Sequence, residues 1–183
     1  MTDVLLITQR PSNLSNKSND VLRYSIKPGK ESLVESVEAQ INSQEWQIVY
    51  DSEIVLTDLA YGNQKVSLRA VSKEGSRSQS IEYRWFVDNV KPVVVINSKP
   101  DAQISADSQI LFSSPEPTAV IATICTINQQ AIPACQSPIP LNNLIKGANY
   151  EVRIQFTDSA GNISDPAVIN FQYVLGDIKS EEI

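Results

Sequence analysis

The sequence predicts an all-β chain that contains two tandem β-sandwich domains of about seven strands each. Two observations lead to this prediction. Hydrophobic residues alternate with polar residues along several segments, for example over Tyr150–Phe156. The hydrophobic pattern also repeats once along the chain, at a spacing of about 85 to 89 residues. Alternation with period two is typical of a strand that has one face in a core and the other in water.

Short matching segments carry the repeat. Leu56–Gly62 matches Leu141–Gly147 at an offset of about 85 residues, and Ala39–Asn42 matches Cys125–Asn128 at an offset of about 86. The offset drifts by single residues, as loop insertions and deletions would cause, while the hydrophobic positions stay in step. We therefore expect the same architecture in both halves.

Seven strands are expected in the second half. They cover residues 93–97, 109–113, 120–127, 131–135, 139–144, 149–157 and 167–175. Seven short strands in about 90 residues, with turn residues between them, are typical of a β-sandwich. A short polar joint at Asp88–Pro92 separates the halves, and the residues after Gly176 are polar and acidic. We expect domain 1 over residues 1–89, domain 2 with one disulfide over 90–176, and a flexible tail over 177–183.

Composition excludes several classes of function. The net charge is −6, the chain has no histidine, and its lysines and arginines form no run. Nucleic acids and anionic membrane surfaces require a clustered basic surface, so neither is an expected partner. No apolar stretch approaches the roughly 20 residues that span a bilayer. Without histidine, a phosphate-binding glycine loop or metal-ligand spacing, we expect no catalytic residues, no metal and no cofactor.

The second half contains a series of short motifs, which are Cys125-Thr-Ile-Asn128, Pro133-Ala-Cys-Gln-Ser-Pro138, Leu144-x-x-Gly147, Tyr150-x-Val-x-Ile154 and Asp158-Ser-Ala-Gly-Asn162. With these motifs the second half resembles the bacterial immunoglobulin-like repeats of long surface and secreted proteins. The spacing from Leu144 to Tyr150 is also similar to that of fibronectin type III modules. The resemblance implies an immunoglobulin-like sandwich that serves as a spacer, stalk or binding module in adhesins and fibres.

The first half matches this pattern only in outline. It has no cysteines, Lys65 stands where the tyrosine would be, and Ser72-Lys-Glu-Gly-Ser76 replaces the Asp-x-Ala-Gly-Asn turn. The resemblance bears on fold far more than on function, because this fold hosts many unrelated tasks.

Cys125 and Cys135 are the only cysteines, and we predict a disulfide that joins neighbouring strands. A metal site is disfavoured with two thiols and no histidine, and a redox-active pair would be expected as Cys-x-x-Cys. The matching positions of the first half are Ala39 and Val49 or Tyr50, so an apolar pair can replace the bridge. A stable disulfide implies an oxidising compartment, which is the medium, the cell surface or the periplasm.

Two further features of the second half have structural and functional interpretations. Asp158, Gly161 and Asn162 lie in a segment that suits a hairpin turn, because Asp and Asn bond their own backbone and Gly supplies a positive φ. The alternative, a fragment of a calcium loop, would need several more oxygen ligands. Tyr150 is expected to form a tyrosine corner, with surface recognition as the alternative.

Trp46 and Tyr61 are the candidate contacts with a ligand or partner. Trp46 lies in a predicted hairpin of the first half, and Tyr61 precedes Gly62 at a domain end. An aromatic ring at a loop edge can anchor a protein partner or stack on a sugar. Trp46 can equally cap the open end of the sandwich.

These observations favour a non-catalytic structural or adhesive module, a tandem immunoglobulin-like stalk or interaction segment of a bacterial cell-surface or secreted protein. The alternative is a carbohydrate- or protein-binding accessory module of a larger secreted enzyme. The expected partners are an unidentified protein or glycan ligand and neighbouring domains of a longer parent chain, since the start of the chain suggests a fragment. We expect no direct membrane insertion.

Overall fold

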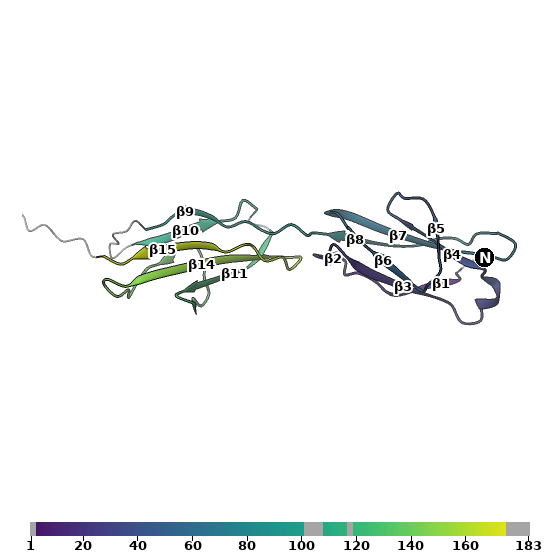
Figure 1. The fold of residues 1–183 in the computed structure, drawn as a ribbon, viewed down its shortest axis with the longest axis horizontal. Coiled ribbons are helices and arrows are strands. Elements are labelled where there is room, and N and C mark those ends of the chain that lie inside the picture. Colours follow the sequence, from purple (N-terminus) through teal and green to yellow (C-terminus); the bar gives the residue numbers. More distant parts are fainter. Residues whose placement is uncertain (1–2, 101–107, 117–118, 175–183) are drawn as a thin grey trace, which may run out of the picture. The chain divides into compact units, whose positions relative to one another are not determined.

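The structure is a computed structural model that describes residues 3–100, 108–116 and 119–174 (Figure 1). It divides between Val90 and Lys91 into two compact units, and each unit has its own hydrophobic core. The described part is built from strands and one short 3-10 helix, so the predicted all-β fold is confirmed. No helix among these residues is long and apolar enough to cross a membrane. The predicted tail over 177–183 lies outside the described residues.

Unit 1 has two facing sheets. Its elements are β1 (Leu5–Gln9), β2 (Leu14–Ser15), β3 (Asp20–Ile26), η1 (Glu31–Leu33), β4 (Ser36–Ile41), β5 (Gln47–Val49), β6 (Glu53–Leu56), β7 (Gly62–Val71) and β8 (Ile81–Val87). One sheet has the order β1-β3-β6, and the other has the order β2-β8-β7-β4-β5. All neighbouring strands are antiparallel except β2, which runs parallel to β8.

The segment between β1 and β2 changes from one sheet to the other. Strand β1 pairs with β3, whereas β2 pairs with the edge of β8 through Leu14 and Ser15. The hydroxyl of Tyr83 donates a hydrogen bond of 2.6 Å to the carbonyl of Pro11, in the middle of this crossing. A buried phenol needs such a partner, so this bond fixes the crossing segment against the second sheet.

Unit 2 repeats the topology of unit 1. Its strands are β9 (Val95–Ser98), β10 (Gln109–Ser113), β11 (Val120–Ile127), β12 (Gln130–Ala131), β13 (Ile139–Pro140), β14 (Asn149–Asp158) and β15 (Ala167–Gln172). The sheets have the orders β13-β10-β9 and β12-β11-β14-β15. These correspond to β6-β3-β1 and β5-β4-β7-β8 of unit 1. Sandwiches with this strand arrangement have the immunoglobulin and fibronectin III type of fold.

Three strands of unit 2 end earlier than the sequence predicts. The strand expected over 131–135 ends at Ala131, the one expected over 139–144 ends at Pro140, and the one expected over 167–175 ends at Gln172. Proline lacks the N–H that a sheet ladder requires, which accounts for the early ends of the first two of these strands, before Pro133 and at Pro140. Ala134 also has a positive φ of 48°, which is incompatible with a continuing strand.

Each unit has an asparagine at the equivalent position, directly after a strand of the larger sheet. Asn42 and Asn128 follow β4 and β11 with φ values of 53° and 46°. The side-chain oxygen of Asn42 accepts a bond of 2.8 Å from the N–H of Lys65, and that of Asn128 accepts one of 2.8 Å from the N–H of Glu151. Asparagine tolerates this conformation better than most residues, so the same residue type ends the strand in each unit.

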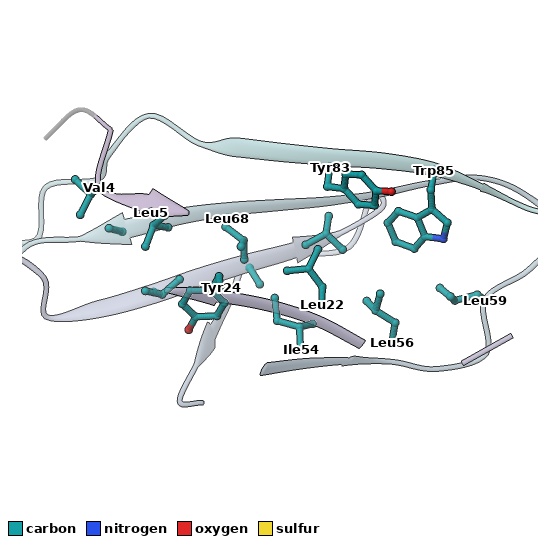
Figure 2. Close-up of a cluster of buried hydrophobic side chains, with 14 of the residues drawn as sticks. Val4, Leu5, Leu22, Tyr24, Ile54, Leu56, Leu59, Leu68, Tyr83 and Trp85 are labelled. Carbon is teal, nitrogen blue, oxygen red and sulfur yellow. The ribbon is translucent and has the colours of Figure 1, made fainter. Parts of the chain in front are cut away.

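Unit 1 packs its core between the two sheets. Figure 2 shows Leu22, Ile54 and Leu56 of the first sheet together with Leu68 and Trp85 of the second. Leu22, Leu56 and Leu68 are fully buried, and Trp85 is 4% exposed. Among the described residues, the indole N–H of Trp85 is the one buried side-chain nitrogen or oxygen atom that lacks a hydrogen-bond partner. The alternating apolar residues of the strands therefore form this core, as their period requires.

The disulfide bond between Cys125 and Cys135 belongs to the core of unit 2. The Cα atoms lie 5.9 Å apart, and both residues are at most 8% exposed. It ties β11 to the chain beyond β12. At the matching positions of unit 1, Ala39 is buried and Val49 packs against the core. Unit 1 therefore has apolar core residues at these positions, with Val49 opposite Val37 and Ala39 opposite Gln47 in the sheet.

Burial predicts unequal effects of two leucine substitutions in unit 1. Leu68→Ala, at a fully buried position, should lower the free energy of unfolding by about 2–5 kcal/mol, whereas Leu6→Ala, at a position 50% exposed, should lower it by under about 1 kcal/mol. Urea unfolding followed by tryptophan fluorescence checks this, because both tryptophans, Trp46 and Trp85, lie in unit 1. Equal midpoint shifts would contradict the described core.

Removal of the disulfide should affect unit 2 alone. The double substitution Cys125→Ala with Cys135→Ala should destabilise this unit by at most about 3 kcal/mol, the entropy of a loop this short. Urea unfolding followed by far-ultraviolet circular dichroism should show an earlier transition, while the tryptophan signal of unit 1 keeps its midpoint. A shift in the tryptophan transition would contradict the independence of the two cores.

Candidate functional site: the outer face of unit 1

The solvent-facing side of sheet β2-β8-β7-β4-β5 gathers the charged residues of its strands. We call this surface the outer band. It comprises Glu38, Trp46, Tyr61, Asn63, Lys65, Ser67, Arg69, Arg77, Glu82, Arg84 and Phe86. In β4, β7 and β8 the band residues alternate with core residues such as Val66 and Leu68, so the period of two places them on one face. Trp46, Tyr61 and Arg77 lie outside the strands and join the band through their contacts with Arg69, Phe86 and Glu38, respectively.

The first cluster of the band surrounds Glu38. Its carboxylate pairs with Nε of Arg69 at 2.7 Å and accepts from both Nε and Nη2 of Arg77 at 3.2 and 3.3 Å. The ring of Trp46 lies on Arg69, with the guanidinium carbon 3.9 Å from the ring centroid. Arginine stacks well on indole, so Trp46 covers this cluster and is itself only partly exposed.

The second cluster surrounds Glu82 on the neighbouring strand. Its carboxylate lies 2.7 Å from Nη2 of Arg84 and 3.6 Å from Nζ of Lys65, and it accepts a bond of 3.3 Å from the hydroxyl of Ser67. The side chain of Arg84 is 68% exposed, whereas that of Lys65 is 28% exposed. The guanidinium of Arg84 is thus the more accessible cation of this cluster.

Tyr61 ends the band on the side of the second cluster. It is 59% exposed, and its ring packs edge-on against Phe86 with the centroids 5.2 Å apart. Trp46 lies over Arg69, whereas Phe86, on which Tyr61 packs, lies opposite Asn63. Asn63 and Arg69 are six residues apart on β7, and a strand rises about 3.3 Å per residue, so roughly 20 Å separate the two ends of the band. Trp46 and Tyr61 therefore share one face of the sheet without forming a single aromatic platform.

Both carboxylates of the band are shifted towards the charged form. Hydrogen bonding from Arg77, followed by that from Arg69, lowers the pKa of Glu38 below its ordinary value despite partial burial. Hydrogen bonding from Arg84 and the charge of Lys65 lower the pKa of Glu82. Each glutamate is therefore ionised at neutral pH and holds two cations in place.

Tyr150 of unit 2 has the geometry of a tyrosine corner. Its hydroxyl accepts a bond of 2.7 Å from the N–H of Ile145, and its half-buried ring stacks on Phe171 with a centroid distance of 5.5 Å. The matching residue of unit 1 is Gln64, not Lys65 as the sequence comparison suggests, because the Asn42–Lys65 bond corresponds to Asn128–Glu151. The buried amide of Gln64 donates to the carbonyl of Ala60 at 2.7 Å and so links the same loop to the strand.

Asp158, Gly161 and Asn162 form a tight turn after β14. The carboxylate of Asp158, which is 2% exposed, accepts bonds of 2.9 Å from the N–H groups of Ala160 and Asn162 and from the side-chain amide of Asn162. Gly161 has a φ of 90°, which L-residues rarely adopt. No group of three or more His, Cys, Asp or Glu side chains placed to hold a metal is found in the part of the chain that the structure describes.

Unit 1 also has an open cleft, lined by β3, η1 and the residues that follow β5. Its volume is about 490 Å³, and Tyr24, Glu31, Glu35, Tyr50 and Asp51 are among its lining residues. The hydroxyl of Tyr24 donates to the carbonyl of Asp51 at 2.9 Å, and burial together with the Asp51 charge raises the pKa of Tyr24. Tyr50 beside it is 92% exposed.

The sequence identified Trp46 and Tyr61 as candidate contacts but missed the cations between them. Alternation alone places Lys65, Arg69 and Arg84 on the solvent side of their strands. Alternation therefore predicts the face on which these cations lie. Only the strand register brings Arg77, Arg69 and Glu38 together, since Arg77 lies 39 residues from Glu38 in the chain.

The lowered pKa of Glu38 predicts a pH-dependent contribution to stability. A depressed pKa stabilises the fold above the ordinary glutamate pKa, and this contribution disappears as the pH falls through the lower folded-state value. Wild type should exceed Glu38→Gln in unfolding free energy by roughly 1 kcal/mol at pH 7, and the difference should shrink as the pH falls below the ordinary glutamate pKa of about 4.5. Urea midpoints from tryptophan fluorescence across this range measure it, and a constant difference down to pH 3 would contradict it.

No protein-family model and no curated protein matches this chain. Solved structures do match. The chain is 15% identical to the fibronectin(III)-like modules of CbhA from Clostridium thermocellum, with 98% of both chains covered and a TM-score of 0.48. SGBP-B of a mixed-linkage glucan utilization locus from Bacteroides ovatus, solved with a mixed-linkage heptasaccharide, is 16% identical over 93% of this chain and 48% of its own, with a TM-score of 0.34.

The central fibronectin-III array of RIM-binding protein is 11% identical over 94% of this chain and 69% of its own, with a TM-score of 0.33. These similarities concern the fold alone. Within each unit, the strand order shows directly that the chain consists of immunoglobulin-like, fibronectin III-like β-sandwich modules.

Proposed function

We propose that this chain is a non-catalytic structural or adhesive module of a bacterial cell-surface or secreted protein. The observation that carries the proposal is the presence of two sandwiches, each with its own core, on one short connector. The connector runs from Asp88 to Val94, between the end of β8 and the start of β9. Domains built in this way serve as repeated units in longer chains.

Each end of the connector is tied to its own unit. The N–H of Asp88 donates to the carbonyl of Ser15 at 2.9 Å, and the side-chain amide of Asn89 donates to Oγ of Ser18 at 2.9 Å. On the other side, Lys91 pairs with Asp165 at 2.7 Å on the surface of unit 2. The connector is therefore short, which agrees with a repeated unit of a longer chain.

The disulfide supports an extracytoplasmic location. A bond between Cys125 and Cys135 persists in an oxidising compartment and is rare in proteins of a reducing one. The neighbouring domains of a longer parent chain are the proposed structural partners. The second candidate, a carbohydrate- or protein-binding module, is favoured by the outer band, where Trp46 and Tyr61 lie on the same face of unit 1.

The proposed location is tested in cells that make the protein. An antibody should reach the chain on intact cells or in the medium, and Cys125 and Cys135 should resist thiol alkylation until reduced.

A replacement experiment separates the spacer from the interaction segment. Residues 3–174 are then replaced by two unrelated β-sandwich domains of equal total length. A spacer tolerates this exchange, and surface display of the adjoining segments persists. An interaction segment does not, and adhesion is lost.

Deletion of the segment without replacement is the matched control, which shortens the parent and should reduce display in both cases. Free thiols at Cys125 and Cys135 in freshly harvested cells, or a chain inaccessible to antibody outside the cell, would overturn the proposed location.

A further inference from the structure

We infer that the outer band of unit 1 binds an acidic polysaccharide, with the carboxylates of uronate sugars on its cations and the sugar rings against its aromatic ends. This inference rests on the second candidate function, a binding role for the module, and names the site and the class of ligand. The whole chain has a net charge of −6, yet this one face collects cations.

The charge of the band follows from its members. Lys65, Arg69, Arg77 and Arg84 supply four positive charges, and Glu38 and Glu82 supply two negative charges, which leaves an excess of two (4 − 2 = 2). Each glutamate neutralises one of its two cations, so each cluster has one excess charge. The most exposed cations are Arg77 and Arg84, at 53% and 68% of the side chain. An anion can reach both.

The register of the sheet places two of these cations directly opposite one another. Lys65 on β7 pairs with Arg84 on β8. Like charges in directly opposed positions of a sheet are destabilising, and Glu82 lies in the adjacent row, where it offsets the repulsion only in part. A bound carboxylate would complete the neutralisation. The opposed cation pair therefore indicates anion binding more specifically than scattered ion pairs would.

The aromatic and amide groups of the band suit a sugar. Tyr61 exposes more than half of its surface beside Phe86, and Asn63, which pairs with Phe86 across the sheet, is exposed between Tyr61 and Lys65. Sugar rings pack against aromatic faces, and amides bond their hydroxyl groups. The band continues past Arg84 and Arg69 to Trp46, so a chain of several sugars would contact both clusters.

An acidic peptide fits this surface less well. Extended peptides bind sheets chiefly by adding a strand to an open edge, where the backbone supplies hydrogen bonds. Strand β2 pairs with β8 only at Phe86 and Val87, and β5 is the other edge of the sheet. The cations Lys65 and Arg69 lie on β7, in the interior of the sheet, so a ligand that reaches them lies across the face and contacts side chains, which favours a polysaccharide.

Unit 2 provides an internal comparison. Its corresponding sheet has the same topology, but on the outer face of β11, β12, β14 and β15 the charged residues are Glu151 and Arg153, which pair with each other at 2.6 Å. Their charges cancel. The cationic band is thus not a consequence of the fold, because one unit has it and the other does not.

Affinity electrophoresis of the whole chain tests the inference, with polygalacturonate as the acidic polysaccharide, dextran as the neutral one, and calcium-free buffer throughout. Polygalacturonate should retard the chain, and dextran should not. The double variant Lys65→Gln with Arg84→Gln should raise the Kd for polygalacturonate at least about tenfold, since charge-assisted hydrogen bonds are lost. Tyr61→Ala should raise it by a smaller factor, and added salt should weaken wild-type binding.

The matched control is Arg23→Gln with Arg153→Gln, which removes two cations from glutamate pairs outside the band and leaves the same net charge. It should bind like wild type, and urea midpoints should show that all variants are folded. No retardation by polygalacturonate, or equal loss in the band and control variants, would overturn the inference. If poly-L-glutamate binds as tightly, and with the same dependence on Lys65 and Arg84, the ligand class is an acidic peptide and not a polysaccharide. A chain that is displayed on cells but binds no polyanion would leave the spacer function standing.

Discussion

Strand β7 is the constraint around which unit 1 is organised. It pairs with β4 on one side and with β8 on the other. Its inward residues Val66, Leu68 and Ala70 are fully buried, and its outward residues Lys65 and Arg69 belong to the two charged clusters. One register therefore sets both the core and the outer band. A shift by one residue would exchange the two sets of side chains, which the burial of the inward residues opposes.

The two units maintain the same backbone with different chemistry. In the turn before the last strand, Asp158 of unit 2 and Ser72 of unit 1 both bond the N–H four residues ahead, at 2.9 and 3.2 Å. The hydroxyl groups of buried Ser164 and Ser78 accept bonds of 2.9 Å from the N–H groups of Phe156 and Ala70 in the preceding strand. The hairpin after β4 is held by Trp46 on Arg69, whereas the one after β11 is held by a disulfide. Such substitutions preserve the fold and leave the outer face free to differ.

The sequence predicted most of the strands because their inward residues alternate without interruption. Errors occurred where local chemistry competes with the pattern. Pro133 and Pro140 ended two strands early, and Lys65 was aligned with Tyr150 although Gln64 occupies that place. An alignment error of one residue is hard to detect from the sequence where a loop of variable length precedes the strand. It became visible only through the hydrogen bonds of Asn42 and Asn128, which mark equivalent positions in the two units.

By itself, the sequence determined the fold class, the repeat of the hydrophobic pattern and which strand residues face the core, since these depend on spacing along one chain. It also singled out Trp46 and Tyr61 as aromatic residues outside the core period. Only the tertiary structure decided what these residues contact. Arg77 reaches Glu38, and Arg84 lies opposite Lys65, through pairings between strands that are distant in sequence. The grouping of the charges of the outer band into two clusters arises from that register, because alternation assigns a side chain to a face but not to its neighbours across the sheet.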